Sequence, residues 1–247
     1  MKIVYYVITK LFLKFIPDQI IVNSKYTMKS LNSKKPCNIV YPSVDISMYN
    51  NISSCKSINV DSDQIVITMV GRIAEWKGQH IFIQAAEQIL NKKDNVIFLI
   101  AGAPLFGEEK YFNYIKNKIK EFKLSQNIQL LGHVNNIPEL LNSTDISVHC
   151  SIEPEPFGQV IIQSMAAGKP VIASAHGGPL EIINNGYDGL LIVPENPTLL
   201  ANTILELIDN NAKRKFIGAN AKIKANNYDI MVQDKAMISA IKNTINY

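Results

Sequence analysis

Residues 151–174 have the sequence SIEPEPFGQVIIQSMAAGKPVIAS, in which a rigid turn leads into an apolar run and a short hydrophobic segment. Pro154 and Pro156 stiffen the chain around Glu155. Residues 158–167 are apolar nearly all round, which predicts a helix buried between a sheet and its neighbours. The closing PVIAS predicts a buried strand. The stretch therefore predicts one helix and one strand of an α/β fold, entered through a turn that carries a carboxylate.

Strands and helices are predicted to alternate on both sides of this stretch. Strands are expected at 65–70, 95–102, 127–134, 145–151, 170–174 and 189–193. Helices are expected at 79–90, 108–122, from 136, at 158–167, at 178–186 and from 197. This alternation predicts an α/β fold, a Rossmann-like parallel sheet with helices on both faces. Ligands of such sheets bind beyond the carboxyl ends of the strands, so we expect the important loops at 71–78, 102–107, 132–136, 150–158 and 174–178.

The sequence outside this domain divides into three parts. Residues 1–42 are expected to hold one helix, one short strand (QIIVNS) and another helix, which is too little for an independent domain. The polar stretch 43–62 predicts a linker, and 229–247 predicts a final helix after the domain at 63–228. The first 16 residues form an apolar run interrupted by lysines, without a small-residue cleavage site, so an amphipathic helix, buried or lying on a membrane, is expected there.

Composition narrows the class of protein. The chain has 247 residues, of which 47% are apolar and 19% charged, as in ordinary soluble globular proteins. A net charge of +4 from scattered basic residues does not indicate nucleic-acid binding; it is compatible with an anionic small molecule or weak contact with an acidic membrane surface. Three cysteines without a CxxC pair indicate reduced thiols in a cytosolic protein. The four histidines have no metal-ligand spacing, so no metal site is expected.

The loop GRIAEWKG at 71–78 carries two cations between a strand and a helix. Arg72 offers a planar fork of donors that matches phosphate oxygens, and Lys77 supplies a mobile point charge. The backbone N–H groups at a helix start also favour anions, so the loop suits a diphosphate. On spacing alone, a surface loop with two solvated cations is the simpler interpretation.

Two further features of the sequence have open interpretations. Gly177 and Gly178 lie between a strand and a helix, which resembles an anion-binding turn, although glycines there are often only tight connectors. Gln159 and Gln163 are four residues apart and share one helix face, which must reach water, a ligand or a partner. In the alternative interpretation Gln163 is a satisfied buried amide, and Glu155 is a helix-start carboxylate favoured by the helix dipole.

Six motifs in order resemble the C-terminal half of the family 4 retaining glycosyltransferases, which have the GT-B fold: IIVNSKYT, YPSVD, GRIAEWKG, LLGHV, SIEPEPFGQVIIQSMAAGKPVIA and GGPLEII. The resemblance covers about residues 20–230. It implies two Rossmann-like domains, with the sugar nucleotide held mainly by the second. Arg72 and Lys77 would then hold the donor diphosphate, and Glu155 would take the first position of the family's E-x7-E motif and contact the transferred sugar.

The resemblance assigns the remaining donor contacts as well. The backbone near Phe157 and Gly158 would contact sugar hydroxyls, and the loop at His133 and Val134 would meet the base. The family usually has glutamate at the second motif position, where it binds ribose hydroxyls, but this chain has Gln163. An amide loses the charge-assisted strength of such bonds. The implied donor site is completed by Gly71, Gln159, Gly177 and Gly178.

The reaction implied by the resemblance is hexosyl transfer from a nucleotide-diphosphate sugar to a glycan or lipid acceptor with retention of configuration. No cofactor and no metal are expected, because two fixed cations and helix N-termini can stabilise the leaving diphosphate without a metal. Residues 1–42 resemble the end of the N-terminal domain, so we expect a truncated or split chain, or a separately encoded N-terminal half.

Two alternative functions remain open. The first is a nucleotide-sugar-binding module without chemistry of its own. The second is a sugar-nucleotide epimerase of related fold, although the motif EPEPFG favours a transferase over an epimerase. The expected place is the cytoplasm, with peripheral contact at the inner face of the membrane as an option.

Overall fold

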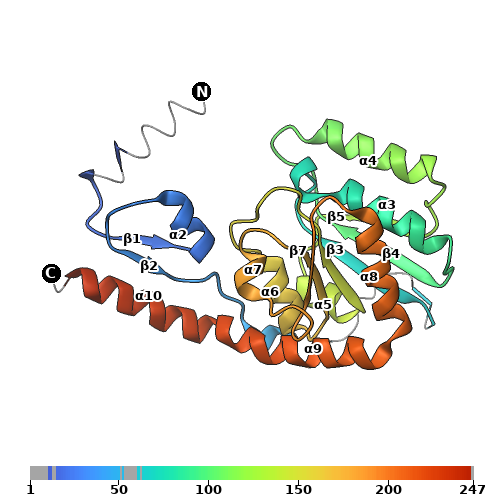
Figure 1. The fold of residues 1–247 in the computed structure, drawn as a ribbon. Coiled ribbons are helices and arrows are strands. Elements are labelled where there is room, and N and C mark those ends of the chain that lie inside the picture. Colours follow the sequence, from blue (N-terminus) through green and yellow to red (C-terminus); the bar gives the residue numbers. More distant parts are fainter. Residues whose placement is uncertain (1–10, 13–14, 51, 53–59, 62, 246–247) are drawn as a thin grey trace.

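The computed structural model describes the chain except for residues 1–10, 13–14, 51, 53–59, 62 and 246–247. Most of the helix expected in the first 16 residues therefore lies outside the described residues, as does Cys55. The described chain forms a main domain around one sheet and a smaller lobe beside it (Figure 1).

The main domain is built on a six-stranded sheet in which every strand pairs in parallel. Its strands are β3 (Ile65–Val70), β4 (Val96–Ala101), β5 (Ile128–Gly132), β6 (Ile146–His149), β7 (Val171–Ser174) and β8 (Leu190–Ile192). All residues of β4, β6 and β7 are buried, as expected for strands covered on both faces. This arrangement confirms the predicted Rossmann-like α/β fold.

Helices cover both faces of the sheet (Figure 1). On one face, α3 (Gln79–Leu90), α4 (Glu109–Glu121) and α8 (Pro197–Asp209) share a core cluster with alternate strand residues such as Ile67 and Met69. On the other face lie α5 (Ile137–Asn142), α6 (Gln159–Ala166) and the second half of α9 (Asn211–Ala225). The Asn136 side chain caps α5 by accepting the Glu139 N–H, as the sequence predicts.

The strand order β5-β4-β3-β6-β7-β8 places the candidate site. The chain builds β3, β4 and β5 in one direction and then returns to the other side of β3 for β6, β7 and β8. The loops after β3 and β6 therefore leave neighbouring strands at the same edge, since Ile67 pairs with Ile146. This reversal is the point at which open α/β sheets form a ligand crevice.

The helix expected to end at Gly186 is shorter in the structure. Helix α7 spans Pro179–Ile182 only. The buried Asp188 accepts the Asn184 N–H at 2.7 Å, which folds the following residues into a turn. This prediction was wrong because a side chain four residues downstream competes with the helical hydrogen bond.

The smaller lobe contains a strand that the sequence analysis did not predict. β1 (Ile20–Val22) leads through α2 (Lys25–Leu31) to a parallel β2 (Cys37–Ile39), where only one strand was expected. β2 has three residues, too few to show a period. The predicted linker includes the 3-10 helix η1 (Ile46–Tyr49), and Val44 exchanges backbone hydrogen bonds with Tyr228 and Ile230.

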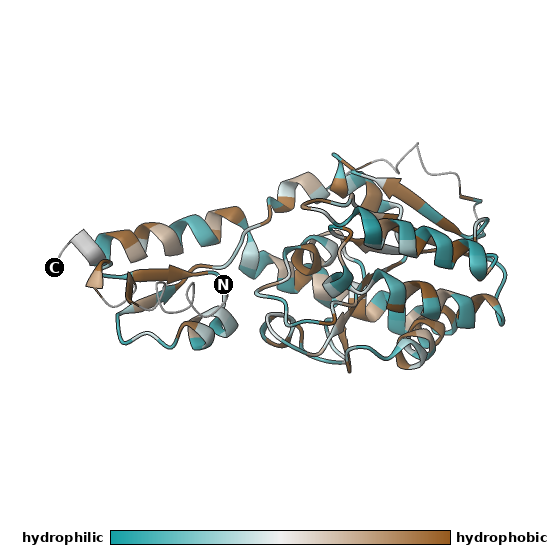
Figure 2. Ribbon diagram, turned by 90° about the horizontal axis from the view of Figure 1, so that it is seen from above, coloured by the Kyte–Doolittle hydropathy of each residue, from teal (hydrophilic) through white to brown (hydrophobic). Residues whose placement is uncertain are grey.

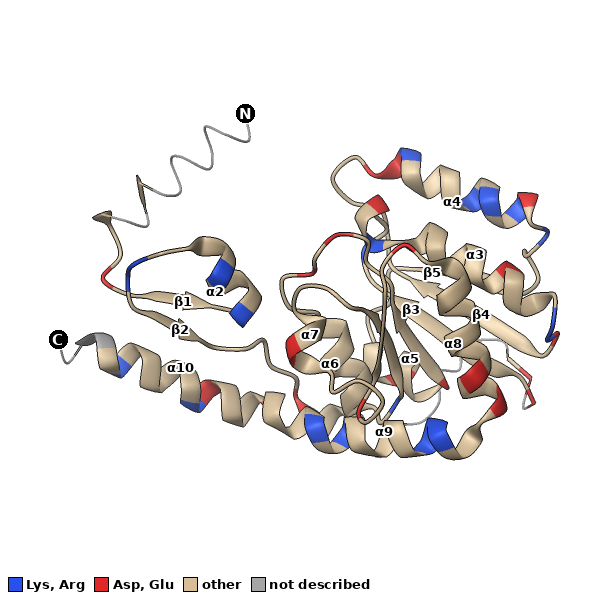
Figure 3. Ribbon diagram, in the orientation of Figure 1, with Lys and Arg blue, Asp and Glu red and all other residues tan. Residues whose placement is uncertain are grey.

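The final helix α10 (Ile230–Ile245) follows the 3-10 helix η3 (Asn226–Tyr228) and extends beside the smaller lobe (Figures 1 and 2). It exposes a set of apolar side chains: Ile230, Met231, Val232, Met237, Ile238 and Ile241. Charged residues are spread over both lobes, with lysines along α4 and α9 (Figure 3). Within the described part of the chain, no helix combines the length and the apolar character needed to cross a bilayer.

Replacement of Phe98 by alanine tests the packing of the sheet. Phe98 is 0% exposed on the second strand of the sheet and contacts Phe82 edge-to-face at 5.6 Å between ring centroids. We expect Phe98→Ala to lower the free energy of unfolding by about 3–5 kcal/mol, because it leaves a cavity. Phe106 is 89% exposed, so Phe106→Ala should change it by less than about 0.5 kcal/mol. Urea unfolding followed by circular dichroism measures both, and equal losses would contradict this placement of Phe98.

Candidate functional site

The loops after β3 and β6 touch along their backbones. The Ile152 N–H donates to the Trp76 carbonyl at 2.8 Å. Gly78, with φ of 79°, sits so close to Cys150 that an added Cβ would lie 2.1 Å from its carbonyl oxygen. Only glycine fits there, so this residue type fixes how closely the two loops approach.

A carboxylate and an ammonium meet where these loops adjoin. Lys77 Nζ, at the end of the 3-10 helix η2 (Glu75–Lys77), lies 2.5 Å from Glu155 Oε2. Both side chains are largely buried, with 16% and 12% exposed. The same oxygen lies 3.2 Å from His149 Nε2 and 3.3 Å from the Ser151 hydroxyl. Oε1 has no hydrogen-bond partner in the described part of the chain, so one oxygen of Glu155 stays open.

The charge state of Glu155 follows from these contacts. Burial alone would raise its pKa, but the hydrogen bond and charge of His149 and the charge of Lys77 outweigh burial and lower the pKa from 4.5 to about 2. The carboxylate is therefore ionised at neutral pH. Since a carboxylate only accepts hydrogen bonds, His149 Nε2 carries the proton in this contact.

Arg72 lies in the same loop as Lys77 and shares an aromatic neighbour with it. The Arg72 guanidinium carbon is 5.8 Å from the Trp76 ring centroid and 5.4 Å from that of Phe106. Lys77 Nζ is 4.1 Å from the same Trp76 ring. The backbone of Arg72 is fixed, because the buried Gln79 side-chain amide donates a hydrogen bond to the Arg72 carbonyl at 2.9 Å. Arg72 forms no ion pair with a described residue, so its guanidinium is available to an anion.

The contacts of Gly177 and Gly178 fit the tight-connector interpretation, which the sequence left open beside the anion-binding turn. Gly177 bridges to Glu155, and the Gly178 N–H donates to the Glu155 carbonyl at 2.7 Å. An added Cβ at Gly178 would lie 2.1 Å from the Phe157 carbonyl oxygen. The Gly178 N–H is thus already used, and the two glycines hold the backbone of the Glu155 turn.

The predicted site residues in and just before the helix after this turn differ in burial and in hydrogen bonding. Phe157 is buried, with its ring 5.6 Å from Tyr41 and 5.7 Å from Tyr228, so its backbone rather than its side chain would face a ligand. Gln159 is exposed and its amide donates to the Ser43 carbonyl at 3.4 Å. Gln163 is half-buried and has no side-chain hydrogen bond to a described residue. It therefore differs from the satisfied amide of the alternative interpretation.

His133 and Val134 follow β5, two strands away from β3 at the same edge of the sheet. His133 is exposed, while Val134 packs beside a buried cluster that includes Val66 and Ala101. Backbone hydrogen bonds link the ends of neighbouring strands at this edge. The Gly102 N–H donates to the Gly132 carbonyl, and the Gly71 N–H donates to the Ala101 carbonyl. No described contact joins His133 or Val134 to Glu155.

Sequence reasoning missed two residues of this cluster. His149 received no role beyond the exclusion of metal, and Ser151 received none, yet both contact Glu155. His176 in turn lies 2.9 Å from the Ser151 carbonyl. The position of His149 in the predicted strand could have indicated its role, because His149 ends β6 at the carboxyl edge, where ligands of such sheets bind.

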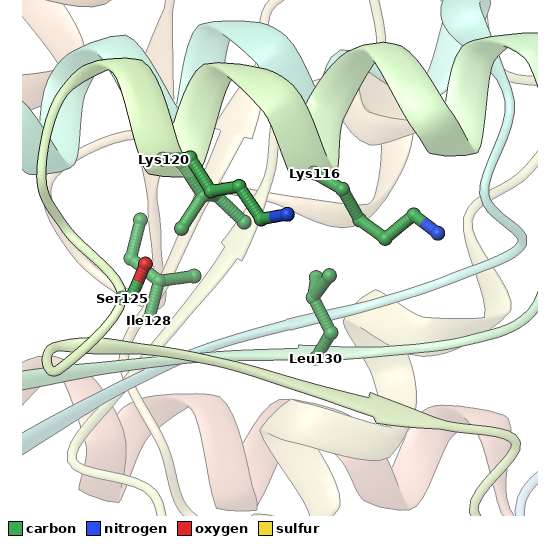
Figure 4. Close-up of a pocket in the computed structure, with 6 residues that line it drawn as sticks. Lys116, Lys120, Ser125, Ile128 and Leu130 are labelled. Carbon is green, nitrogen blue, oxygen red and sulfur yellow. The ribbon is translucent and has the colours of Figure 1, made fainter.

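The described residues contain no group of three or more His, Cys, Asp or Glu side chains that could hold a metal ion. A separate hollow of about 220 Å³ lies between α4 and β5 and is lined by Lys116, Ile119, Lys120, Ser125, Ile128 and Leu130 (Figure 4). Ile128 begins β5, so this hollow lies toward the amino ends of the strands, away from the predicted site residues.

The Glu155 cluster predicts an acid-labile contribution to stability. Its folded-state pKa of about 2 is depressed below 4.5, so the stabilisation is present above about pH 4.5 and is lost as pH falls toward 2. Glu155→Gln should therefore remove on the order of 3 kcal/mol of unfolding free energy at pH 6 and much less at pH 2.5. Urea unfolding of both proteins across this range measures the difference. A difference in unfolding free energy between the two proteins that stays constant from pH 6 to pH 2.5 would contradict the depressed pKa.

Comparison with known proteins identifies the family. Residues 53–224 match the family described as glycosyl transferases group 1. The chain is 32% identical over 181 residues to an uncharacterized glycosyltransferase, MJ1607, of Methanocaldococcus jannaschii, covering 72% of this chain and 45% of that one. It is 28% identical over 226 residues to spore coat protein SA of Bacillus subtilis, covering 84% and 60%.

A solved structure shows the same fold. The Anabaena protein Alr3699/HepE, solved with UDP and glucose, superposes with a TM-score of 0.90 at 27% identity, covering 98% of this chain and 67% of that one. The chain spans about half the length of the curated relatives it matches. Because the family match extends over most of the described main domain, the chain belongs to the glycosyl transferases group 1 family and has a GT-B-type Rossmann-like domain.

Proposed function

We propose that this chain binds the donor of a retaining glycosyltransferase, which moves a hexosyl group from a nucleotide-diphosphate sugar to a glycan or lipid acceptor. The observation that carries the proposal is the convergence of Lys77 and Glu155 from two loops at the reversal point of the sheet. HepE, a structural relative, was solved with UDP-glucose, which supports a nucleotide-sugar donor here. Retention of configuration is carried over from the family resemblance.

The two cations suit the diphosphate of such a donor. Lysine has three N–H donors, and Lys77 uses one of them on Glu155, which leaves two for phosphate oxygens. Arg72 adds a planar guanidinium without a carboxylate partner among the described residues. As the sugar–phosphate bond breaks, negative charge grows on the leaving diphosphate. Fixed cations stabilise that charge without requiring a metal.

Glu155 suits the sugar. Its ionised carboxylate has one oxygen held by Lys77, His149 and Ser151, and the other oxygen is open to accept a hydrogen bond from a hydroxyl group. A carboxylate–hydroxyl bond is charge-assisted and stronger than a neutral one. The backbone of Phe157 and Gly158 follows directly and would contact neighbouring hydroxyls. The base would lie toward His133 and Val134, and the ribose toward Gln163.

The second candidate function is a nucleotide-sugar-binding module that acts only with a separately encoded N-terminal half. The observation that favours it is the set of exposed apolar side chains on α10, which extends beside the smaller lobe. Such surfaces often mark protein contacts. Donor binding by the chain alone, without transfer to any acceptor, would distinguish this function from complete catalysis.

Removal of either cation should weaken donor binding. We expect Arg72→Ala and Lys77→Ala each to lower UDP affinity roughly 10- to 100-fold, since a hydrogen bond to a charged group contributes roughly 1.5–3 kcal/mol. In an assembly that transfers sugar, each change should raise the barrier by roughly 2.7–4 kcal/mol. Isothermal titration calorimetry with UDP measures the first effect. Lys120→Ala, in the separate hollow, is the matched control, and losses no larger than in that control would refute the assignment.

A charge at position 163 should strengthen donor binding. Gln163 is half-buried on α6, and a glutamate there would accept ribose hydrogen bonds with charge assistance. We expect Gln163→Glu to raise UDP affinity about 3- to 10-fold, in line with the gain from charging one acceptor. The control is Gln159→Glu, which adds the same charge to an exposed position on the same helix face. Unchanged affinity in Gln163→Glu, or an equal gain in both variants, would place the ribose elsewhere.

A further inference from the structure

Helix α7 and the smaller lobe are joined by one carboxylate. Glu181 Oε2 accepts the Lys25 N–H at 3.0 Å, and Oε1 accepts the Tyr26 N–H at 3.3 Å. The Tyr41 hydroxyl also donates to Oε2, at 3.2 Å. Glu181 thus connects the first turn of α2 and the segment after β2 to the main domain.

A second contact runs from α2 to the Glu155 turn. Ser24, the N-cap of α2, is 0% exposed, and its hydroxyl lies 2.6 Å from the carbonyl oxygen of Pro156, to which it donates. The Ser24 oxygen also accepts the Thr27 N–H at 2.9 Å. The hydroxyl therefore holds the helix start and the Glu155 turn together.

These contacts close a ring around the Glu155 turn. Gly178, three residues before Glu181, donates its N–H to the Glu155 carbonyl. Ser24 holds the next carbonyl, that of Pro156. Lys25, the residue after Ser24, donates its N–H to Glu181. Glu181 belongs to α7, the helix that Gly178 precedes. Helices α2 and α7 face each other in Figure 1. The turn is therefore held from two sides, and one side depends on the Glu181 carboxylate.

We propose that Glu181 and Ser24 are positioning residues that set the place of Glu155 against the donor sugar. The inference rests on the proposed function in one respect, that Glu155 contacts the sugar. Neither residue would touch the donor: both act through the backbone of residues 155–156. Without Glu181, the start of α2 loses its acceptor, Ser24 withdraws, and the Pro156 carbonyl loses its donor.

The tyrosine contact does not depend on an ionisation of the phenol near neutral pH. Burial and the neighbouring Glu181 charge raise the pKa of Tyr41 to about 12. The phenol is therefore protonated at neutral pH and donates to Glu181. No acid–base change near neutral pH is needed for the contact, so it is a fixed support.

Hydrogen exchange of the ligand-free chain tests the ring directly. In Glu181→Ala the amides of residues 24–28 should exchange about tenfold faster, the change expected when a hydrogen bond to a charged group is lost. The proposal also requires faster exchange at 153–160, a segment that Glu181 does not touch. Ser24→Ala, which removes only one hydroxyl, should give the same rise at 153–160. Glu206→Ala is the matched control, since Glu206 binds only the surface Lys213 among the described residues. Exchange that rises at 24–28 alone would overturn the proposal.

Ligand affinities then separate positioning from general damage to the fold. UDP lacks the sugar, so Glu181→Ala should leave its affinity within about twofold, while UDP-glucose affinity should fall about 5-fold or more because its sugar contact is misplaced. Equal losses for both ligands, or an unchanged UDP-glucose affinity, would overturn the positioning role. If the wild-type chain bound neither UDP nor UDP-glucose, the proposed function would fail, and the exchange experiment would still decide whether the ring exists.

Discussion

The site depends on the contact between Lys77 and Glu155, which brings opposite charges from two different loops together in a largely buried place. A buried carboxylate without partners would take up a proton, but His149 and Lys77 keep this one ionised. The contact requires the two loops to approach at a fixed distance. Gly78 provides that approach, because a Cβ there would collide with the Cys150 carbonyl oxygen of the facing loop. Gly178, after β7, holds the Glu155 turn from its other side.

The strand order explains why these groups meet at all. The loops after β3 and β6 are about 80 residues apart in the chain, yet they leave adjacent parallel strands at the point where the order reverses. Cations come from the first loop and the carboxylate from the second. A ligand beside them meets positive charge at one end and a hydrogen-bond acceptor at the other, which matches a diphosphate linked to a sugar. The smaller lobe adds a support to this turn through Ser24 and Glu181.

Much of this arrangement could be predicted from the sequence, and the remainder depends on distant contacts. The buried strands, the helices with caps such as Asn136 and the loops at 71–78 and 150–158 follow from local patterns. The parallel sheet then brings those loops to one edge. The short strand β2 has too few residues for a period, and α7 ends early because of the downstream Asp188. The roles of His149 and of the Gly178 N–H depend on which groups lie opposite them, which no local pattern records.

A crystal structure of this chain with UDP-glucose tests the central claim most directly. The account predicts the diphosphate between Arg72 and Lys77, with a sugar hydroxyl within hydrogen-bond distance of Glu155 Oε1. A ligand bound in the hollow between α4 and β5 would contradict it. A ligand bound where the strand order reverses, but without contact to Arg72, Lys77 or Glu155, would also contradict it.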